Sequence, residues 1–207
     1  MAEGARIRVR GLDLEISEEV YIPAEDSLLL LDSIDRWGDL RGLKCLDVGT
    51  GTGIAAILMA KMGCETFATD LTAESVELAC KNARLNGVTL HVTQGDLMSH
   101  FRGSSFDIIT FNPPYLPERP SGTGLSLSWA GGSGGREVID RFLADLPRVL
   151  REGGRAIVLH ADYNEPGLTL EWGRKRGFEV RTVSRKKLAF HELLVLELRL
   201  KSRIAAH

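Results

Sequence analysis

The sequence predicts an α/β sandwich in which a mostly parallel sheet is covered by helices on both faces. Two observations predict this class. Short apolar stretches alternate with longer stretches of helical periodicity, and several of the short stretches are apolar at nearly every position. Strands alternating with helices of about 10 to 15 residues are typical of parallel sheets, and continuously apolar strands are buried on both faces. In such a Rossmann-like sheet, ligands bind beyond the carboxyl ends of the strands, so we expect the functional residues there.

The elements follow in a regular order. Seven strands are expected at 43–48, 65–69, 89–93, 106–111, 156–159, 178–184 and 193–200, and the last two form a closing antiparallel pair, which makes the final strand antiparallel. Helices are expected at 54–62 and at 168–175. A third helix is expected between an N-cap at Thr72 and Gly87. A fourth carries an apolar stripe at 139–146 and is expected to end at Gly153-Gly154. Ahead of them lie an alternating segment at 7–16 and a helix that begins near Pro23.

Length and composition narrow the possibilities. The 207 residues are expected to form one domain, with an N-terminal extension and helix at 1–40 and the Rossmann-like core at 41–207. Lysine and arginine number 26 against 28 acids, a net charge of −2, whereas proteins that bind duplex DNA normally carry a basic excess. No apolar run is long enough to span a bilayer and no signal peptide is visible. We therefore expect a cytoplasmic protein without a membrane or nucleic-acid partner.

Cysteines and histidines give no sign of a metal site. Cys45, Cys64 and Cys80 are odd in number and make no CxxC pair. They predict reduced, mostly buried thiols in a cytoplasmic protein. The five histidines show no metal-ligand spacing, so no metal is predicted.

A glycine-rich loop follows the first strand, in the segment DVGTGTG at 47–53. Gly49 and Gly51 let the backbone turn tightly and approach a ligand at a helix N-terminus. The spacing is not that of a dinucleotide fingerprint, because Ile54 stands where its last glycine belongs, and no GK[ST] follows as in a P-loop. By itself the loop is a weak signal, and an ordinary tight strand-to-helix turn is the alternative.

Two further acids follow the next two strands. Asp70 stands where a carboxylate can accept both hydrogen bonds of a ribose diol. Asp96 ends the third strand, where an acid can bind an adenine amino group while the backbone N–H of Leu97 meets a ring nitrogen. Three acids after three successive strands predict a nucleoside with a charged tail. In S-adenosylmethionine the tail is an amino acid, whose ammonium group Asp47 and the loop can hold.

Asn112-Pro113-Pro114-Tyr115 follows the fourth strand and is the most specific motif of the chain. Because prolines lack an N–H, the Pro113 carbonyl and the Asn112 side-chain oxygen can accept both hydrogens of one planar NH2 group, while Tyr115 stacks on its plane. An amide nitrogen is a poor nucleophile because its lone pair is delocalised. Holding both hydrogens favours the pyramidal nitrogen that attacks a sulfonium methyl group. A proline-rich turn after a buried strand is the alternative.

Two other stretches accompany this motif. YIPAEDSL at 21–28 is similar to a YxPAED[ST] segment, and WAGG at 129–132 with GREVIDRF at 135–142 is similar to a WAGG…GREV-DRF block. In this combination the chain resembles the HemK-type release-factor glutamine methyltransferases, in their short archaeal and eukaryotic branch. These belong to the class I S-adenosylmethionine-dependent methyltransferases. NPPY alone would also admit DNA adenine-N6 methyltransferases.

The resemblance implies roles for individual residues. Cofactor contacts are implied for Ser27, Asp47, Gly49, Asp70, Asp96, Leu97 and Asn112, beside Gly51 of the glycine loop. Substrate contacts are implied for Asn112, Pro113, Pro114 and Tyr115, with Asn112, Pro113 and Tyr115 as the catalytic set. Two positions depart from the family pattern: Ser27 stands where threonine is frequent, and Asp47 where some members carry glutamate.

The resemblance also implies an activity and partners. A single methyltransferase domain over 1–207 would methylate the side-chain amide of glutamine in the Gly-Gly-Gln loop of a translation release factor. The alternatives are methylation of adenine in DNA, methylation of a protein lysine, and a cofactor-binding scaffold without catalysis. A small zinc-binding activator subunit is expected at strand 89–93, which lies at a sheet edge in the usual strand order of this fold. The loop at 116–135, with Trp129 as an apolar anchor, is expected to gate the substrate.

Overall fold

The structure is a computed structural model that describes residues 5–118 and 129–202. A seven-stranded sheet forms its centre, in the order β5-β4-β3-β6-β7-β9-β8. Its strands are β3 (Lys44–Val48), β4 (Glu65–Asp70), β5 (His91–Gln94), β6 (Phe106–Phe111), β7 (Leu150–Ala161), β8 (Phe178–Lys187) and β9 (Glu192–Leu200). β9 runs antiparallel to β7 and β8, and the other pairs are parallel. The prediction of a mostly parallel sheet with an antiparallel final strand is confirmed.

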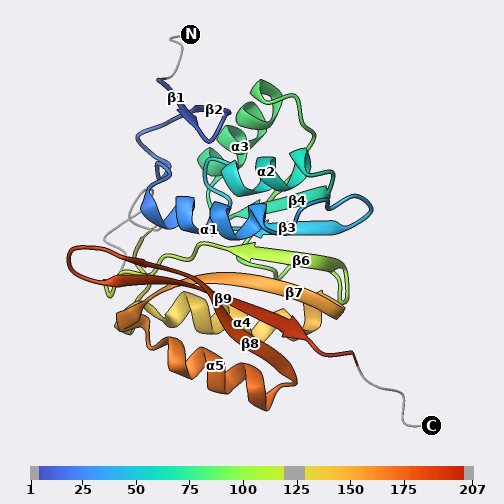
Figure 1. Ribbon diagram of the computed structural model, residues 1–207. Helices are drawn as coiled ribbons and strands as arrows, with labels where there is room; N and C mark the ends of the chain where they lie inside the picture. The colour runs from blue at the N-terminus through green and yellow to red at the C-terminus, as the bar shows by residue number, and fades with distance from the viewer. Residues whose placement is uncertain (1–4, 119–128, 203–207) are drawn as a thin grey trace.

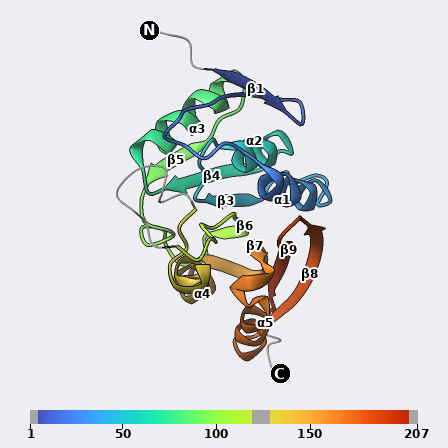
Figure 2. The ribbon, with the colours of Figure 1, turned by 90° about the vertical axis from the view of Figure 1, so that its left-hand side faces the viewer.

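Helices cover the sheet on both faces (Figures 1 and 2). They are α1 (Glu25–Asp35), α2 (Ile54–Lys61), α3 (Ala73–Leu85), α4 (Glu137–Val149) and α5 (Pro166–Lys175), with short 3₁₀ turns η2 (Ser133–Gly135) and η3 (Asp162–Asn164). Because successive strand residues point to opposite faces, Ile108 packs into the core under α1 and α2, whereas Ile109 packs into the core under α4. Within the described residues no helix combines the length and apolar character needed to cross a bilayer.

A two-stranded hairpin lies outside the sheet, formed by β1 (Arg6–Val9) and β2 (Leu12–Glu15). It is attached to α3 by Asn82, whose side chain is fully buried. The Asn82 amide accepts from the Glu15 N–H at 2.7 Å, and its Nδ2 donates to the carbonyls of Glu15 and Thr52. Since Thr52 belongs to the glycine loop, the hairpin supports that loop through one buried amide.

α1 begins at Glu25, which agrees with the predicted start near Pro23, but the predicted end of α4 is wrong. α4 ends at Val149, and Gly153-Gly154 lies inside β7. The pairing with β6 is irregular between Phe106 and Ile108, where β7 carries the two glycines. A Cβ on Gly154 would stand 3.0 Å from the carbonyl oxygen of Asp107, so the glycines permit close strand packing and do not end a helix.

The prediction of reduced thiols is wrong for two of the three cysteines. Cys45 and Cys64 form a disulfide, and Cys80 is free. Cys45 lies in β3 and Cys64 directly precedes β4, so the pairing of these adjacent strands brings their Cα atoms within 6.1 Å. The spacing of 19 residues along the chain gives no hint of this contact, which only the strand order creates.

We expect reduction of this disulfide to lower the free energy of unfolding by about 3 kcal/mol, because it releases a closed loop of about 20 residues in the unfolded chain. Urea unfolding with and without a phosphine reductant measures the difference. The Cys45→Ala variant is the control and should not respond to the reductant. An equal response of wild type and Cys45→Ala would show that the disulfide does not contribute.

Candidate functional site

A cavity of about 430 Å³ lies beyond the carboxyl ends of β3, β4, β5 and β6. Every residue that the sequence singled out lines it: Ser27, Asp47, Gly49, Gly51, Asp70, Asp96, Leu97, Asn112, Pro113, Pro114 and Tyr115. These residues come from five separate stretches of the chain, because the carboxyl ends of parallel strands meet at one edge of a sheet. The fold therefore brings the predicted cofactor and substrate residues into one cavity.

The glycine loop is fixed to the strand beside it. The Gly51 N–H donates to the Asp70 carboxylate at 2.9 Å, and the Thr50 N–H donates to the Thr69 carbonyl. The other Asp70 oxygen accepts from the Thr72 N–H. At Gly53, where φ is +82°, a Cβ would stand 3.1 Å from Ala79 of α3, so only glycine allows α2 to start this close to α3. Asp70 thus shapes the loop and still lines the cavity.

Asp47 is almost fully buried, with 3% of its surface exposed. Its two carboxylate oxygens accept from the hydroxyls of Thr50 and Thr110, both at 2.7 Å. Burial raises the pKa of the Asp47 carboxyl to about 6, although these hydrogen bonds favour the charged form. The Asp47 side chain is therefore a buried acid beside the glycine loop, where it can bind a cationic ligand.

We expect the free energy of unfolding to fall as pH rises from about 4 to about 6. In this window the unfolded chain has released the Asp47 proton while the native chain retains it, so folding takes up a proton and each pH increment favours the unfolded state. With a shift of about two pKa units the total is about 3 kcal/mol. Urea unfolding from pH 4 to 7 measures it, and Asp47→Asn should flatten this decline. Parallel profiles for the two proteins would contradict the assignment.

Asp96 lies at the rim of the cavity, and about half of its side chain is exposed. It forms an ion pair with Arg141 of α4, and both residues line the cavity. Leu97 follows with φ at +49°, a left-handed conformation that is unusual for leucine. The strand end is therefore held by α4, a contact that the sequence analysis did not anticipate.

Asn112 carries an unpaired acceptor. Its Nδ2 donates to the carboxylate of Asp26 at 3.1 Å, whereas its Oδ1 is buried and has no hydrogen-bond partner. An unsatisfied buried carbonyl costs free energy, so its presence beside a cavity points to a ligand that supplies the donor. The bond to Asp26 fixes which end of the amide faces the acid and leaves Oδ1 free.

Asp26 is a site residue that the sequence analysis missed. It is 3% exposed and also accepts from the hydroxyl of Tyr21 at 3.1 Å and from the Ser27 N–H. Burial, followed by the negative charge of Asp26, raises the pKa of the Tyr115 hydroxyl well above its ordinary value, so Tyr115 stays protonated. In the sequence Asp26 stood inside the YxPAED[ST] segment without a role of its own, and an acid in the first turn of a helix is common for reasons of helix stability alone.

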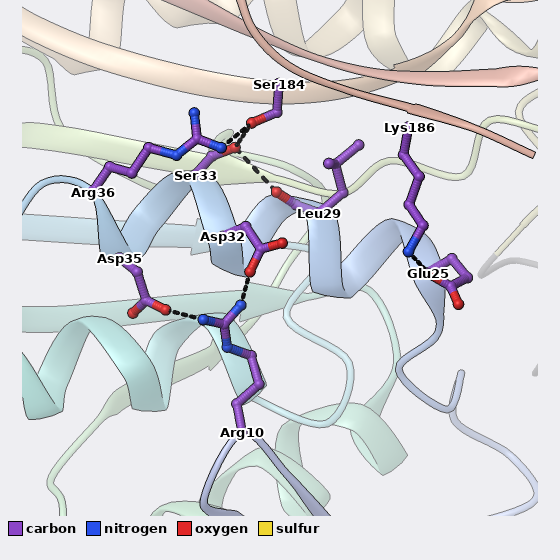
Figure 3. Close-up of polar contacts among 9 residues, drawn as sticks. All are labelled: Arg10, Glu25, Leu29, Asp32, Ser33, Asp35, Arg36, Ser184 and Lys186. Carbon is purple, nitrogen blue, oxygen red and sulfur yellow. Dashed lines mark hydrogen bonds and ion pairs between the residues drawn. The ribbon is translucent and has the colours of Figure 1, made fainter.

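α1, which carries Asp26 and Ser27, is held from two sides (Figure 3). On one side Arg10 of the hairpin turn pairs with Asp32 and Asp35. On the other side the Ser33 hydroxyl lies 2.8 Å from that of Ser184 in β8. Lys186 of β8 also forms an ion pair with Glu25 (Figure 3). α1, which orients Asn112 through Asp26, is therefore attached to the N-terminal hairpin on one side and to β8 on the other.

A buried amide positions the backbone of the NPPY motif. Asn164, fully buried at the end of η3, donates through Nδ2 to the Tyr115 carbonyl at 2.8 Å and to the carbonyls of Gly134 and Gly135. Arg136 donates to the Asn164 carbonyl at 2.7 Å and to the Thr169 hydroxyl. The GREV stretch thus packs against the NPPY motif. Asn164 follows the end of β7, and that position was the only signal that could have indicated it.

The loop that was expected to gate the substrate is described only at its two ends, since residues 119–128 lie outside the described residues. Leu116 pairs with both sides of Ala130: its N–H donates to the Trp129 carbonyl and its carbonyl accepts from the Gly131 N–H, both at 2.8 Å. Trp129 lines the cavity. These bonds place the two ends of the loop side by side at the cavity wall.

In the described part of the chain, no three histidine, cysteine, aspartate or glutamate side chains gather as a group that could hold a metal ion.

Comparison with known proteins finds a matching family model and several similar proteins. Residues 25–165 match the family model of the methyltransferase small domain. A protein of Methanocaldococcus jannaschii that is named as a protein N5-glutamine methyltransferase is 37% identical over 92% of this chain and 96% of its own length. The human methyltransferase HEMK2 is 32% identical over 86% of this chain and 89% of its own length.

A solved structure agrees with these matches. The Mtq2-Trm112 complex of E. cuniculi, which is responsible for the methylation of the translation termination factor eRF1, matches with a TM-score of 0.74. It is 27% identical to this chain, and the match covers 88% of this chain and 99% of the matched one.

Proposed function

This chain belongs to the methyltransferase small-domain family and, within it, to the HemK-type N5-glutamine methyltransferases. We propose that it transfers the methyl group of S-adenosylmethionine to the side-chain amide nitrogen of glutamine in the Gly-Gly-Gln loop of a translation release factor. The observation that carries this proposal is the buried, unpaired Oδ1 of Asn112 in the common cavity. It is an acceptor that lacks the N–H donor an amide would bring.

The cavity suits the methyl donor. Asp70 would bind the ribose diol, Asp96 and the Leu97 N–H would bind the adenine, and Asp47 with the loop at Gly49 and Gly51 would hold the amino-acid end. Ser27 and Asn112 would complete the contacts. The bound donor supplies an electrophilic methyl group on a positively charged sulfur. The buried carboxylate of Asp47 fits the positive charge of the ammonium group at the donor's amino-acid end, because a nearby cation favours the ionised form of a buried acid.

The chain's own residues would activate the amide by position. Asn112 Oδ1 and the Pro113 carbonyl accept the two amide hydrogens, and Tyr115 stacks on the amide plane beside Pro114. Asp26 is a positioning residue, because its bond to Asn112 Nδ2 keeps Oδ1 turned to the substrate. The nitrogen lone pair would then face the methyl group. The new nitrogen–carbon bond would form as the carbon–sulfur bond breaks, which leaves a neutral thioether, and the extra proton on nitrogen would pass to water. Holding the amide in this orientation can lower the activation barrier for methyl transfer without a strong base.

The test uses the chain purified from its own cells with any bound subunit. It is incubated with labelled S-adenosylmethionine and a release factor, or the same factor with its loop glutamine replaced. We expect label on the first protein only. Equal labelling of both would contradict the glutamine assignment. Label on DNA would favour the adenine alternative, and label on a lysine of another protein would favour the lysine alternative.

We further propose a small zinc-binding activator subunit that adds a strand to β5. Two observations support it: β5 is a sheet edge with mostly exposed residues, and the similar Mtq2 structure was solved as a complex with Trm112. An edge strand leaves backbone donors and acceptors unpaired, which a second chain can complete. Co-purification from native cells should yield a stoichiometric zinc protein, and Thr93→Lys at the edge should release it. A fully active monomer would contradict this proposal.

We propose a cytoplasmic location, because a release factor acts on cytoplasmic ribosomes. Cell fractionation followed by immunodetection tests it, and recovery of the chain in an exported or membrane fraction would contradict it.

A further inference from the structure

The turn between β8 and β9 carries the most exposed apolar side chain of the described residues. Phe190 is 98% exposed, and the turn is closed by a bond from the Leu188 N–H to the His191 carbonyl at 2.8 Å. Burying a phenylalanine ring removes a large apolar surface from water, and this fold leaves that gain unused. One exposed ring is not unusual in itself, so its surroundings decide whether it has a function.

The turn lies at the same edge of the sheet as the cavity. β9 pairs with β7 so that Leu193 faces Ala161, the last residue of β7, and β7 is parallel to β6, whose end leads into Asn112. The turn is seen beyond the start of α1 in Figure 1. Tyr163, just after β7, connects the turn to the cavity, since its ring centre is 5.6 Å from that of His191 and the next residue, Asn164, donates to the Tyr115 carbonyl.

The turn is also held in place. Lys186, two residues before Leu188, forms the ion pair with Glu25 at the start of α1, next to Asp26 (Figure 3). Ser184 of the same strand is bonded to Ser33 of α1 and to Arg36, the residue that follows α1. Phe190 is therefore presented on an anchored hairpin, so a partner that covers it has little ordering entropy to overcome.

The surface around the cavity is apolar with mixed charges. Tyr163 is 36% exposed, and Ile22, directly before the cavity residue Pro23, is 46% exposed. The charged side chains that line the turn are one base, Lys187, and two acids, Asp162 and Glu192, so the turn is not a basic patch. Such a surface does not suit a phosphate backbone, which is bound by clustered lysine and arginine. It suits an apolar patch on a folded protein.

We propose that Phe190, Tyr163 and Ile22 form a docking surface for the folded protein substrate, which lays an apolar patch against them while its target loop enters the cavity. This inference rests on the proposed function and adds how the substrate is recognised outside the reacting side chain. Recognition beyond the target loop would select one folded protein among the many that expose a glutamine.

The experiment compares Phe190→Asp with Leu85→Asp in steady-state methylation of a release factor. Leu85 is the matched control, because it is an apolar residue, 38% exposed, at the end of α3 away from the cavity. We expect Phe190→Asp to raise KM for the release factor at least tenfold while kcat and the affinity for S-adenosylmethionine stay within twofold of wild type. Leu85→Asp should change none of these, and Ile22→Asp should resemble Phe190→Asp.

The outcomes separate the two proposals. A wild-type chain that methylates the release factor, with an unchanged KM in Phe190→Asp, overturns the docking surface and leaves the proposed function intact. A lower kcat at unchanged KM also overturns it, since Phe190 would then act on the reacting groups. A wild-type chain that puts no label on the release factor overturns the proposed function itself.

Discussion

Asn112→Ala should lower kcat for amide methylation at least a hundredfold, a barrier increase of about 2.7 kcal/mol or more. The variant removes a buried acceptor of the cavity that has no hydrogen-bond partner in the structure. Without it the amide keeps one free N–H, rotates in the cavity and retains its planar, unreactive nitrogen. Affinity for S-adenosylmethionine should fall by less than about tenfold (roughly 1.4 kcal/mol), because the proposed contacts of Asp47, Asp70 and Asp96 remain.

Single-turnover kinetics and calorimetry separate the two effects. A variant that retains more than a tenth of the wild-type kcat would contradict the role of Asn112. Asp26→Asn is the companion variant: it keeps the size of the side chain but offers Asn112 Nδ2 a neutral partner that can turn either way. We expect an intermediate loss of kcat that Asp26→Glu, which restores a carboxylate, partly recovers. Equal activity of wild type and Asp26→Asn would remove the positioning role.

Gly135→Ala should lower the free energy of unfolding by about 3 to 5 kcal/mol. At this position φ is +66°, and a Cβ would stand 1.9 Å from the Tyr115 carbonyl and 2.5 Å from Asn164 Nδ2. Neither group can move easily, because Asn164 is fully buried and bonded to that same carbonyl. The backbone of the NPPY motif would shift with the strain, so kcat should fall as well.

Gly134→Ala provides the matched control for this prediction. Gly134 has almost the same backbone conformation, with φ at +61°, but a Cβ there would meet nothing within 4 Å. It should therefore cost only the left-handed strain of an alanine, about 1 kcal/mol, and leave kcat unchanged. Urea unfolding and steady-state kinetics of both variants measure the contrast. Equal losses in the two would show that packing against Tyr115 is not the cause.

The sequence alone predicted the order of the helices and strands and most of the residues proposed here for the site that lines the cavity. Strands such as 106–111 are apolar at nearly every position because both faces are covered, and this signal is local in the chain. Residues that follow such strands must meet at one sheet edge, so Asp47, Asp70, Asp96 and Asn112 could be grouped before any contact was known.

What the tertiary structure alone decided depends on contacts between distant residues. The disulfide of Cys45 with Cys64, the bond of Asp26 to Asn112 and the bond of Asn164 to Tyr115 each join positions whose separation in sequence carries no periodic or motif signal. Hydrogen bonding and disulfide formation require atoms to lie within a few ångströms, a condition that strand order and helix packing create. The sequence by itself determined that Asp47, Asp70, Asp96 and Asn112 line one cavity, whereas packing determined how they are held and brought Asp26 among them.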